Sequence, residues 1–181
     1  MELEIKHLAA YLPYGLNLLV YTNTVNPILM ELAMLGNNHS RAYVESKHFS
    51  GWVEDFKPIL RPLSDLTKEI DHNGERFVPM MDLFMCINDI HMVDLNYGKL
   101  DYSDNNVTFG CDEGWNYWIC FSKPDIVLSY DITEQRFALM RDCEYLDFNY
   151  IEMHDKLLDL HFDVFNLIPN NLAIDINTLD K

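Results

Sequence analysis

A series of short apolar segments broken by turn residues, within residues 97–140, constrains the fold more than any other feature of the sequence. Over residues 115–122 aromatic or aliphatic side chains recur at every second position, the period of a strand with one buried face. Strands are also expected over residues 126–130 and 136–140, and Ser103–Asn106 is typical of a hairpin turn. Because hairpin connections join strands that run in opposite directions, this part of the chain predicts an antiparallel meander.

The N-terminal third contains three more apolar runs with the character of strands: Leu16–Thr22, Ile28–Leu35 and Arg41–Glu45. Gly36–Asn38 separates the second run from the third and is predicted to be a hairpin connection. Tyr11–Gly15, with a proline at its centre, is predicted to form a turn before the first strand.

The central part of the chain begins with two prolines four residues apart, which suit an extended arm. A short helix is expected to start at Pro62 or Ser64 and to continue through Lys68. Asn73-Gly74 is the strongest short signal for a tight two-residue hairpin. Residues 80–92 repeat apolar side chains at helical spacing and predict a second helix.

The clearest helical pattern lies near the C-terminus, where a helix is expected from about Tyr145 to Phe162. Its apolar residues are spaced by four, three, four and three positions: Leu146, Tyr150, Met153, Leu157 and Leu160. We expect this stripe to pack against the sheet. Antiparallel strands with one long amphipathic C-terminal helix and one or two shorter helices predict an α+β fold.

The net charge of the chain restricts the kind of partner that it can bind. The chain has 29 Asp and Glu against 13 Lys and Arg, a formal net charge of −16, and residues 82–181 hold nineteen of these acids but six of the bases. Such a surface repels nucleic acid and anionic membranes and favours a basic partner. The alternative is an acidic surface that serves solubility alone. A length of 181 residues, 49% of them hydrophobic, predicts a single domain over residues 1–181.

The sequence predicts no export signal and no membrane span, because it opens without a basic region and lacks an apolar run of about 20 residues. We therefore expect a cytoplasmic protein. The four cysteines show no C-x-x-C spacing and are expected to be reduced: Cys86, Cys111, Cys120 and Cys143. Gly-rich phosphate loops, G-x-S-x-G and H-E-x-x-H are absent from the sequence. No catalytic residue, metal ligand or cofactor is predicted.

Four groups of residues suggest a functional site, but each has a structural explanation that is stronger. Asp71–Gly74 resembles the start of a histidine–asparagine nuclease hairpin, but the later ligand positions are apolar. His154 and His161 lie seven residues apart, about 10 Å along a helix, too far to share one zinc ion. Asp101–Asn106 lacks the glycine and terminal glutamate of a calcium loop. The aromatic residues 115–118 have acidic neighbours, unlike a nucleic-acid stacking platform.

Three stretches carry a resemblance to a known family: Lys57–Ile70 with Asn73–Pro79, His161–Asn177, and His7–Leu16. They resemble the central block, the C-terminal signature and the opening of proteins encoded by phages, prophages and other mobile elements of Bacteroidetes bacteria. The resemblance covers about a quarter of the chain. It implies that the whole domain is similar to these mobile-element proteins and acts inside a bacterial host cell. It implies no activity and no site residue.

These observations favour a non-enzymatic phage or prophage accessory protein that binds a basic host or phage protein. A more specific form of this hypothesis is an acidic surface that mimics nucleic acid. Two alternatives stay open: an enzyme that assembles scattered carboxylates and histidines in a cleft, and a structural virion component. The sequence does not determine the oligomeric state. The predicted partner-binding residues are acids of the meander turns and of the last helix: Asp101, Asp104, Asp112, Glu113, Asp147, Glu152, Asp155 and Asp159.

Overall fold

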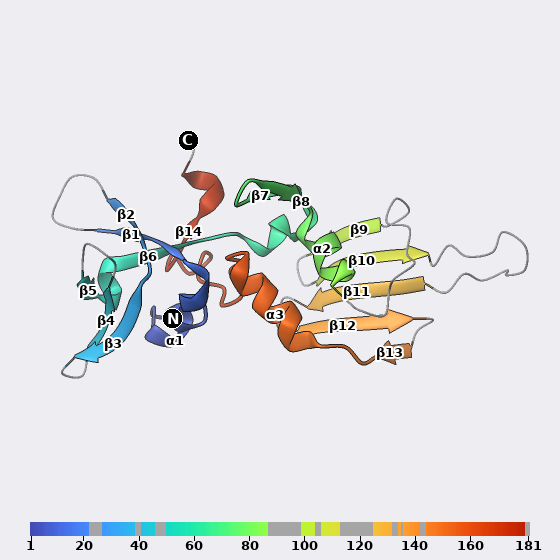
Figure 1. The fold of residues 1–181 in the computed structure, drawn as a ribbon, viewed down its shortest axis with the longest axis horizontal. Coiled ribbons are helices and arrows are strands. Elements are labelled where there is room, and N and C mark those ends of the chain that lie inside the picture. The colour runs from blue at the N-terminus through green and yellow to red at the C-terminus, as the bar shows by residue number, and fades with distance from the viewer. Residues whose placement is uncertain are drawn as a thin grey trace, which may run out of the picture. The chain divides into compact units, whose positions relative to one another are not determined.

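The computed structural model describes residues 1–21, 27–38, 41–45, 50–86, 99–103, 106–112, 125–131, 134, 136–141 and 144–179. These residues divide into two compact units, residues 1–62 with 157–181 (unit one) and residues 63–156 (unit two). Helices and antiparallel strands are found in both units, which confirms the α+β class (Figure 1). The expectation that residues 1–181 form a single domain stays a prediction.

The main sheet of unit one has, within the described residues, four strands in the order β14-β6-β1-β2. Its members are β1 (Asn17–Val20), β2 (Ile28–Glu31), β6 (Phe56–Leu60) and β14 (Ile174–Asp175). β1 runs antiparallel to β2 and β6, whereas β14 runs parallel to β6. Leu18 and Val20, two positions apart on β1, are fully buried, so one face of this sheet lines the core.

A smaller sheet in unit one is formed, among the described strands, by β3 (Met34–Asn38), β4 (Arg41–Glu45) and β5 (Ser50–Trp52). The strand expected over residues 28–35 is therefore wrong in its extent, because the chain turns inward at Leu32. Leu32 is buried and donates its backbone N–H to the Leu16 carbonyl at 2.8 Å. Gly36–Asn38, expected to be a connection, lies inside β3, where cross-strand pairing with β4 outweighs the local turn preference.

Short helical elements complete unit one: α1 (Ile5–Ala9) and the 3-10 turns η1 (Leu12–Tyr14), η2 (Val53–Asp55) and η5 (Ile176–Thr178). The predicted turn over Tyr11–Gly15 is confirmed, since η1 ends at Gly15 in the left-handed conformation, with φ of 64°. Large side chains that are fully buried in this unit come from α1, β1, β6, the residues beside η1 and the segment after α3, and include Leu8, Tyr11, Leu16, Leu18, Phe56, Leu60 and Phe162.

Unit two opens with the 3-10 turn η3 (Leu63–Thr67), which confirms the short helix expected after the proline-containing arm. α2 (Pro79–Met85) follows, with proline in its first turn, where the missing N–H costs no hydrogen bond. It confirms the beginning of the helix expected over residues 80–92, whereas residues 87–92 lie outside the described residues. α2 buries Met80, Leu83 and Phe84 completely, so it provides a large part of the core of this unit.

Asn73 and Gly74 form the tip of a hairpin between β7 (Ile70–His72) and β8 (Glu75–Phe77), as predicted. Asn73 has φ of 56° and Gly74 has φ of 86°, the left-handed values that a two-residue hairpin of this kind requires. The Asp71 carboxylate accepts a hydrogen bond from the Gly74 N–H at 3.1 Å. Asp71 therefore has a structural role in the turn.

Gly74→Val is expected to lower the free energy of unfolding by about 1 kcal/mol or more, because a β-branched residue is strained at positive φ. Space does not oppose the substitution, since a Cβ at Gly74 meets nothing within 4 Å. Gly74→Asn is the matched control and should cost less, because asparagine tolerates the left-handed region. Equal losses for both variants in urea denaturation would contradict backbone strain as the cause.

The predicted meander is present in unit two as an antiparallel sheet with the order β13-β12-β11-β10-β9 among the described strands (Figure 1). Its strands are β9 (Lys99–Ser103), β10 (Asn106–Asp112), β11 (Asp125–Asp131), β12 (Arg136–Arg141) and β13 (Glu144–Leu146). The strands expected over residues 126–130 and 136–140 are confirmed, and Ser103 pairs with Asn106 across the expected hairpin. The strand expected over residues 115–122 lies outside the described residues.

The long C-terminal helix expected from Tyr145 to Phe162 is wrong in its extent, because α3 runs from Tyr150 to Asp159. Its beginning is delayed because Glu144–Leu146 pairs with β12 as β13, and Asn149 then caps the helix by accepting the Glu152 N–H at 3.3 Å. Of the predicted apolar stripe, Met153, Leu157 and Leu160 are buried, Leu146 is half-buried and Tyr150 is exposed.

α3 ends in a Schellman motif. The Phe162 N–H bonds to the Leu157 carbonyl at 2.9 Å and the His161 N–H bonds to the Leu158 carbonyl at 3.0 Å. His161 occupies the left-handed position with φ of 59°, where glycine is usual. The helix therefore stops before Phe162 without the glycine that marks such an end in a sequence.

Candidate functional site

The acids predicted to bind a partner fall into two groups. Those expected in the meander turns are not described at the level of side chains: Asp101 lies in β9 and Asp112 ends β10, while Asp104 and Glu113 lie outside the described residues. Those near α3 are described in full. Asp147, Glu152 and Asp155 have exposed side chains in unit two, and Asp159 is half-buried at the end of the helix.

One of the acids near α3, Glu152, makes a polar contact, and a lysine of the same helix pairs with an acid of α2. The Asn149 side-chain amide donates to a Glu152 carboxylate oxygen at 3.2 Å, so Glu152 contributes to the cap of the helix. The Lys156 ammonium lies 3.6 Å from an Asp82 carboxylate oxygen and links α3 to α2. Both partners of this pair are more than a third exposed, so the pair contributes little stability. Asp147 and Asp155 add exposed negative charge on either side of these contacts.

Sequence reasoning missed a buried carboxylate in unit one. Asp163 is 4% exposed, and its two carboxylate oxygens accept the backbone N–H groups of Leu167 and Ile168, each at 2.7 Å. Burial raises the pKa of Asp163, although the two backbone N–H groups act in the opposite direction. The carboxylate therefore closes the turn that follows α3.

The chain at residues 161–163 is hydrogen-bonded to other segments of unit one. Arg61 donates its N–H to the His161 carbonyl and accepts the Asp163 N–H, both at 2.8 Å. The Tyr11 hydroxyl donates to the Phe162 carbonyl at 2.6 Å, and the His161 ring contacts the Tyr14 carbonyl through Nε2 at 2.8 Å. These bonds attach the segment after α3 to β6 and to the turn η1.

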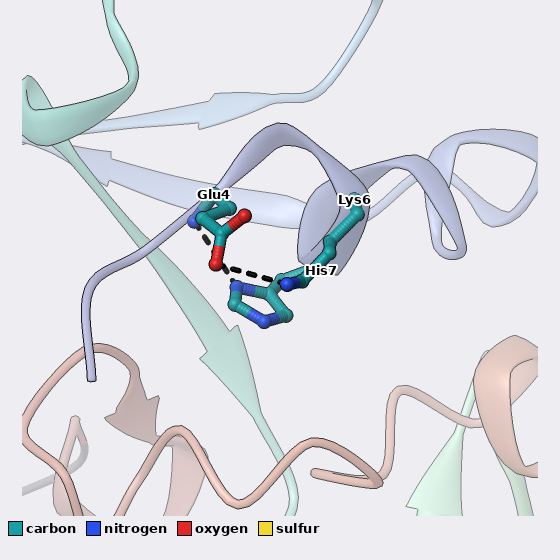
Figure 2. A network of polar contacts seen from close by, with 3 residues as sticks. All are labelled: Glu4, Lys6 and His7. Carbon is teal, nitrogen blue, oxygen red and sulfur yellow. Dashed lines mark hydrogen bonds and ion pairs between the residues drawn. The ribbon is translucent and has the colours of Figure 1, made fainter.

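A second buried polar side chain, His7, stabilises the N-terminal helix. Figure 2 shows the contact: the Glu4 backbone N–H donates to His7 Nδ1 at 3.0 Å, and the Lys6 ammonium donates to the Glu4 carboxylate at 2.9 Å. The His7 ring lies 5.5 Å from the ring of Phe165. Burial lowers the pKa of His7, which favours the neutral imidazole that this contact needs.

Stability should respond to pH through His7. Its pKa is lower in the folded chain than in the unfolded chain, so its contribution is present above about pH 6.5 and is lost as the pH falls through the folded value. His7→Gln should remove this component, so that the wild type loses stability relative to the variant below about pH 6.5. Urea denaturation from pH 8 to pH 5 measures the difference. His154→Gln on α3 is the control, and an equal change in both variants would contradict the assignment to His7.

Three buried polar side chains of the described residues make structural contacts. Asp163 and His7 bond to backbone groups, and Asp65, also buried, accepts the Lys68 ammonium at 2.7 Å. Burial raises the pKa of the Cys86 thiol, with nearby Asp82 adding to the effect, so little nucleophilic thiolate forms at neutral pH. In the described part of the chain no group of three or more His, Cys, Asp or Glu side chains is placed to hold a metal ion.

The sequence contained weak signals for these residues. Asp163 stands four and five residues before the N–H groups that it accepts, and aspartate is favoured in turns because its side chain can bond to nearby backbone groups. His7 stands three residues after Glu4, the spacing of a capping box, with histidine in place of the usual glutamate or glutamine. Neither pattern shows from sequence that the side chain is buried.

None of the described helices combines the length and the apolar character needed to cross a membrane. Comparisons with protein-family models, with curated proteins and with solved structures found no match for this chain.

Proposed function

We propose that this chain is a non-enzymatic accessory protein of a phage or prophage that acts inside the bacterial host cell by binding a basic protein partner. The observation that supports the proposal best is the exposed acidic group before and along α3, formed by Asp147, Glu152 and Asp155. The acidic excess over residues 82–181 and the resemblance to mobile-element proteins support it further. The acids Asp101, Asp104, Asp112, Glu113 and Asp159 stay predicted partner-binding residues.

Electrostatic recognition follows from such a surface. Exposed charges of one sign create a field that steers an oppositely charged partner and raises its association rate. The same field repels the phosphates of nucleic acid. The partner is then a protein with a basic groove or segment, such as a host protein whose natural ligand is nucleic acid.

The test compares capture from host cytoplasm by the wild type and by a triple variant, Asp147→Asn, Glu152→Gln and Asp155→Asn. Captured proteins are identified by mass spectrometry at low and at physiological salt. The wild type should retain basic proteins at low salt and lose them as salt rises, because exposed charges are screened beyond about 8–10 Å. The triple variant should lose the same proteins at low salt.

A matched control neutralises the same number of exposed acids in the first 81 residues: Glu2→Gln, Glu31→Gln and Glu75→Gln. This variant should capture the same basic proteins as the wild type. If the two triple variants lose the partners equally, net charge rather than the surface near α3 determines binding. If neither variant differs from the wild type, the acidic residues serve solubility, and the proposal is wrong.

A further inference from the structure

Unit two exposes large apolar side chains in the stretch that leads from the sheet into α3. Tyr145 is 77% exposed, Tyr150 is 63% exposed and Ile151 is 57% exposed. The same unit buries Leu66, Met80, Leu83 and Phe84 completely, so it has a well-formed core that excludes these three residues. Adjacent exposed aromatic and aliphatic side chains with polar neighbours are typical of a protein-binding surface.

Tyr145 lies on β13, the edge strand of the sheet (Figure 1). Cross-strand pairing places it opposite Met140, whereas Leu146 is opposite Leu139, which is 2% exposed. Because successive side chains of a strand point to opposite faces, Tyr145 stands on the face away from Leu139. Among the described strands, β13 has β12 as its neighbour on one side. No described strand pairs with its other side, to which the backbone N–H and C=O groups of another strand can add.

The acidic residues near β13 indicate that a strand added to it would carry basic side chains. Glu144, Asp147 and Glu152 have exposed side chains and alternate along the chain with the exposed apolar residues. The sequence has no Lys or Arg between Arg141 and Lys156. Tyr145 and Tyr150 are five positions apart, so their Cα atoms lie within about 18 Å of each other, no more than the length of a strand of five or six residues.

We propose that β13 and the start of α3 bind an extended, Arg- or Lys-rich segment of a partner protein, which adds to β13 as a further antiparallel or parallel strand. This proposal rests on the proposed function, since it specifies the partner of the same acidic surface. The basic side chains meet Glu144, Asp147 and Glu152, and the two tyrosines provide apolar and cation–π contact. A second copy of this chain would bring like charges together at this edge, and nucleic acid would bring phosphates against carboxylates.

The test uses a ten-residue peptide of alternating Arg and Val as the probe, with isotope-labelled full-length protein observed by NMR. A second peptide carries N-methyl groups on alternate backbone amides, which removes the N–H donors that strand addition needs. The amide signals of residues 144–151 should shift with the first peptide. The dissociation constant should rise by about tenfold or more with the N-methylated peptide, because the backbone bonds provide much of the affinity.

Substitutions test whether the side chains of Tyr145 and Tyr150 contribute to binding. Tyr145→Ser with Tyr150→Ser should weaken binding of the first peptide by about tenfold or more, since aromatic residues dominate such interfaces. Tyr21→Ser is the matched control, because Tyr21 is 50% exposed in unit one, and it should leave binding unchanged. Both tyrosines near α3 are exposed, so the double variant should keep the native fold and its amide spectrum.

The outcomes separate this inference from the proposed function. If both peptides bind the wild type and the double tyrosine variant equally and are released by salt, strand addition is wrong, and the acidic surface alone carries the binding. If neither peptide binds at low salt, strand addition fails and so does the electrostatic basis of the proposed function. If single-stranded DNA shifts the same amide signals and competes with the peptide, the protein-partner assignment is overturned.

Discussion

Asp163→Ala is expected to destabilise the protein by about 2–5 kcal/mol, the largest effect of any polar substitution considered. The substitution leaves the buried N–H of Leu167 and the part-buried N–H of Ile168 without their carboxylate acceptor. Each unsatisfied buried donor costs about 1–3 kcal/mol. The loss should appear as a lower midpoint in urea denaturation with an unchanged m-value.

The control for Asp163 is another aspartate that accepts a backbone N–H at the surface. Asp175 accepts the Asn177 N–H at 2.9 Å in an exposed turn, so Asp175→Ala should cost about 1 kcal/mol or less, because water replaces the carboxylate. A loss at Asp163 no greater than the loss at Asp175 would show that burial does not amplify the bond. Asp163→Asn should fall between wild type and alanine, because the amide retains one acceptor oxygen.

Leu157→Ala is expected to cost about 2–4 kcal/mol, the usual range for a fully buried leucine. Leu157 has no exposed surface, and the Schellman motif holds its carbonyl by the Phe162 N–H at 2.9 Å. Shortening the side chain removes apolar contacts and leaves a cavity that the fixed end of the helix cannot readily fill. Urea or thermal denaturation monitored by circular dichroism measures the change.

Ile151→Ala is the matched control on the same helix, because Ile151 is 57% exposed. Alanine has the higher helix propensity, so this variant should change the free energy of unfolding by less than about 0.5 kcal/mol. A small loss at Leu157, similar to that at Ile151, would contradict its assignment to the core. The pair thus tests which face of α3 the protein buries.

Local sequence signals predicted those elements whose geometry depends on a few adjacent residues. Asn73-Gly74 specified the hairpin because only residues that tolerate positive φ can form its tip. The strand over Arg41–Glu45 was predicted with the bounds that β4 has. Two strands of the meander were predicted from the apolar runs over residues 126–130 and 136–140 and the turn residues beside them.

Predictions were wrong where pairing with the adjacent strand of a hairpin outweighed the preference of the segment itself. The apolar spacing from Leu146 onward is helical, yet pairing with β12 draws Glu144–Leu146 into a strand and leaves Tyr150 exposed. Gly36–Asn38 has the composition of a turn, yet it forms part of β3 because β4 pairs with it. In both cases the partner strand is adjacent in sequence, and the pairing depends on contacts between the two strands that the composition of the segment alone does not show.

The α+β class, the antiparallel meander and the Asn73-Gly74 hairpin could be predicted before the fold was known, because they follow from apolar runs, turn chemistry and composition. Packing in the folded chain buries Asp163 and His7 against backbone groups and leaves Tyr145 and Tyr150 outside the core. Burial depends on which distant segments pack together, and the same side chain at the same spacing is stabilising in a core and available for binding at a surface.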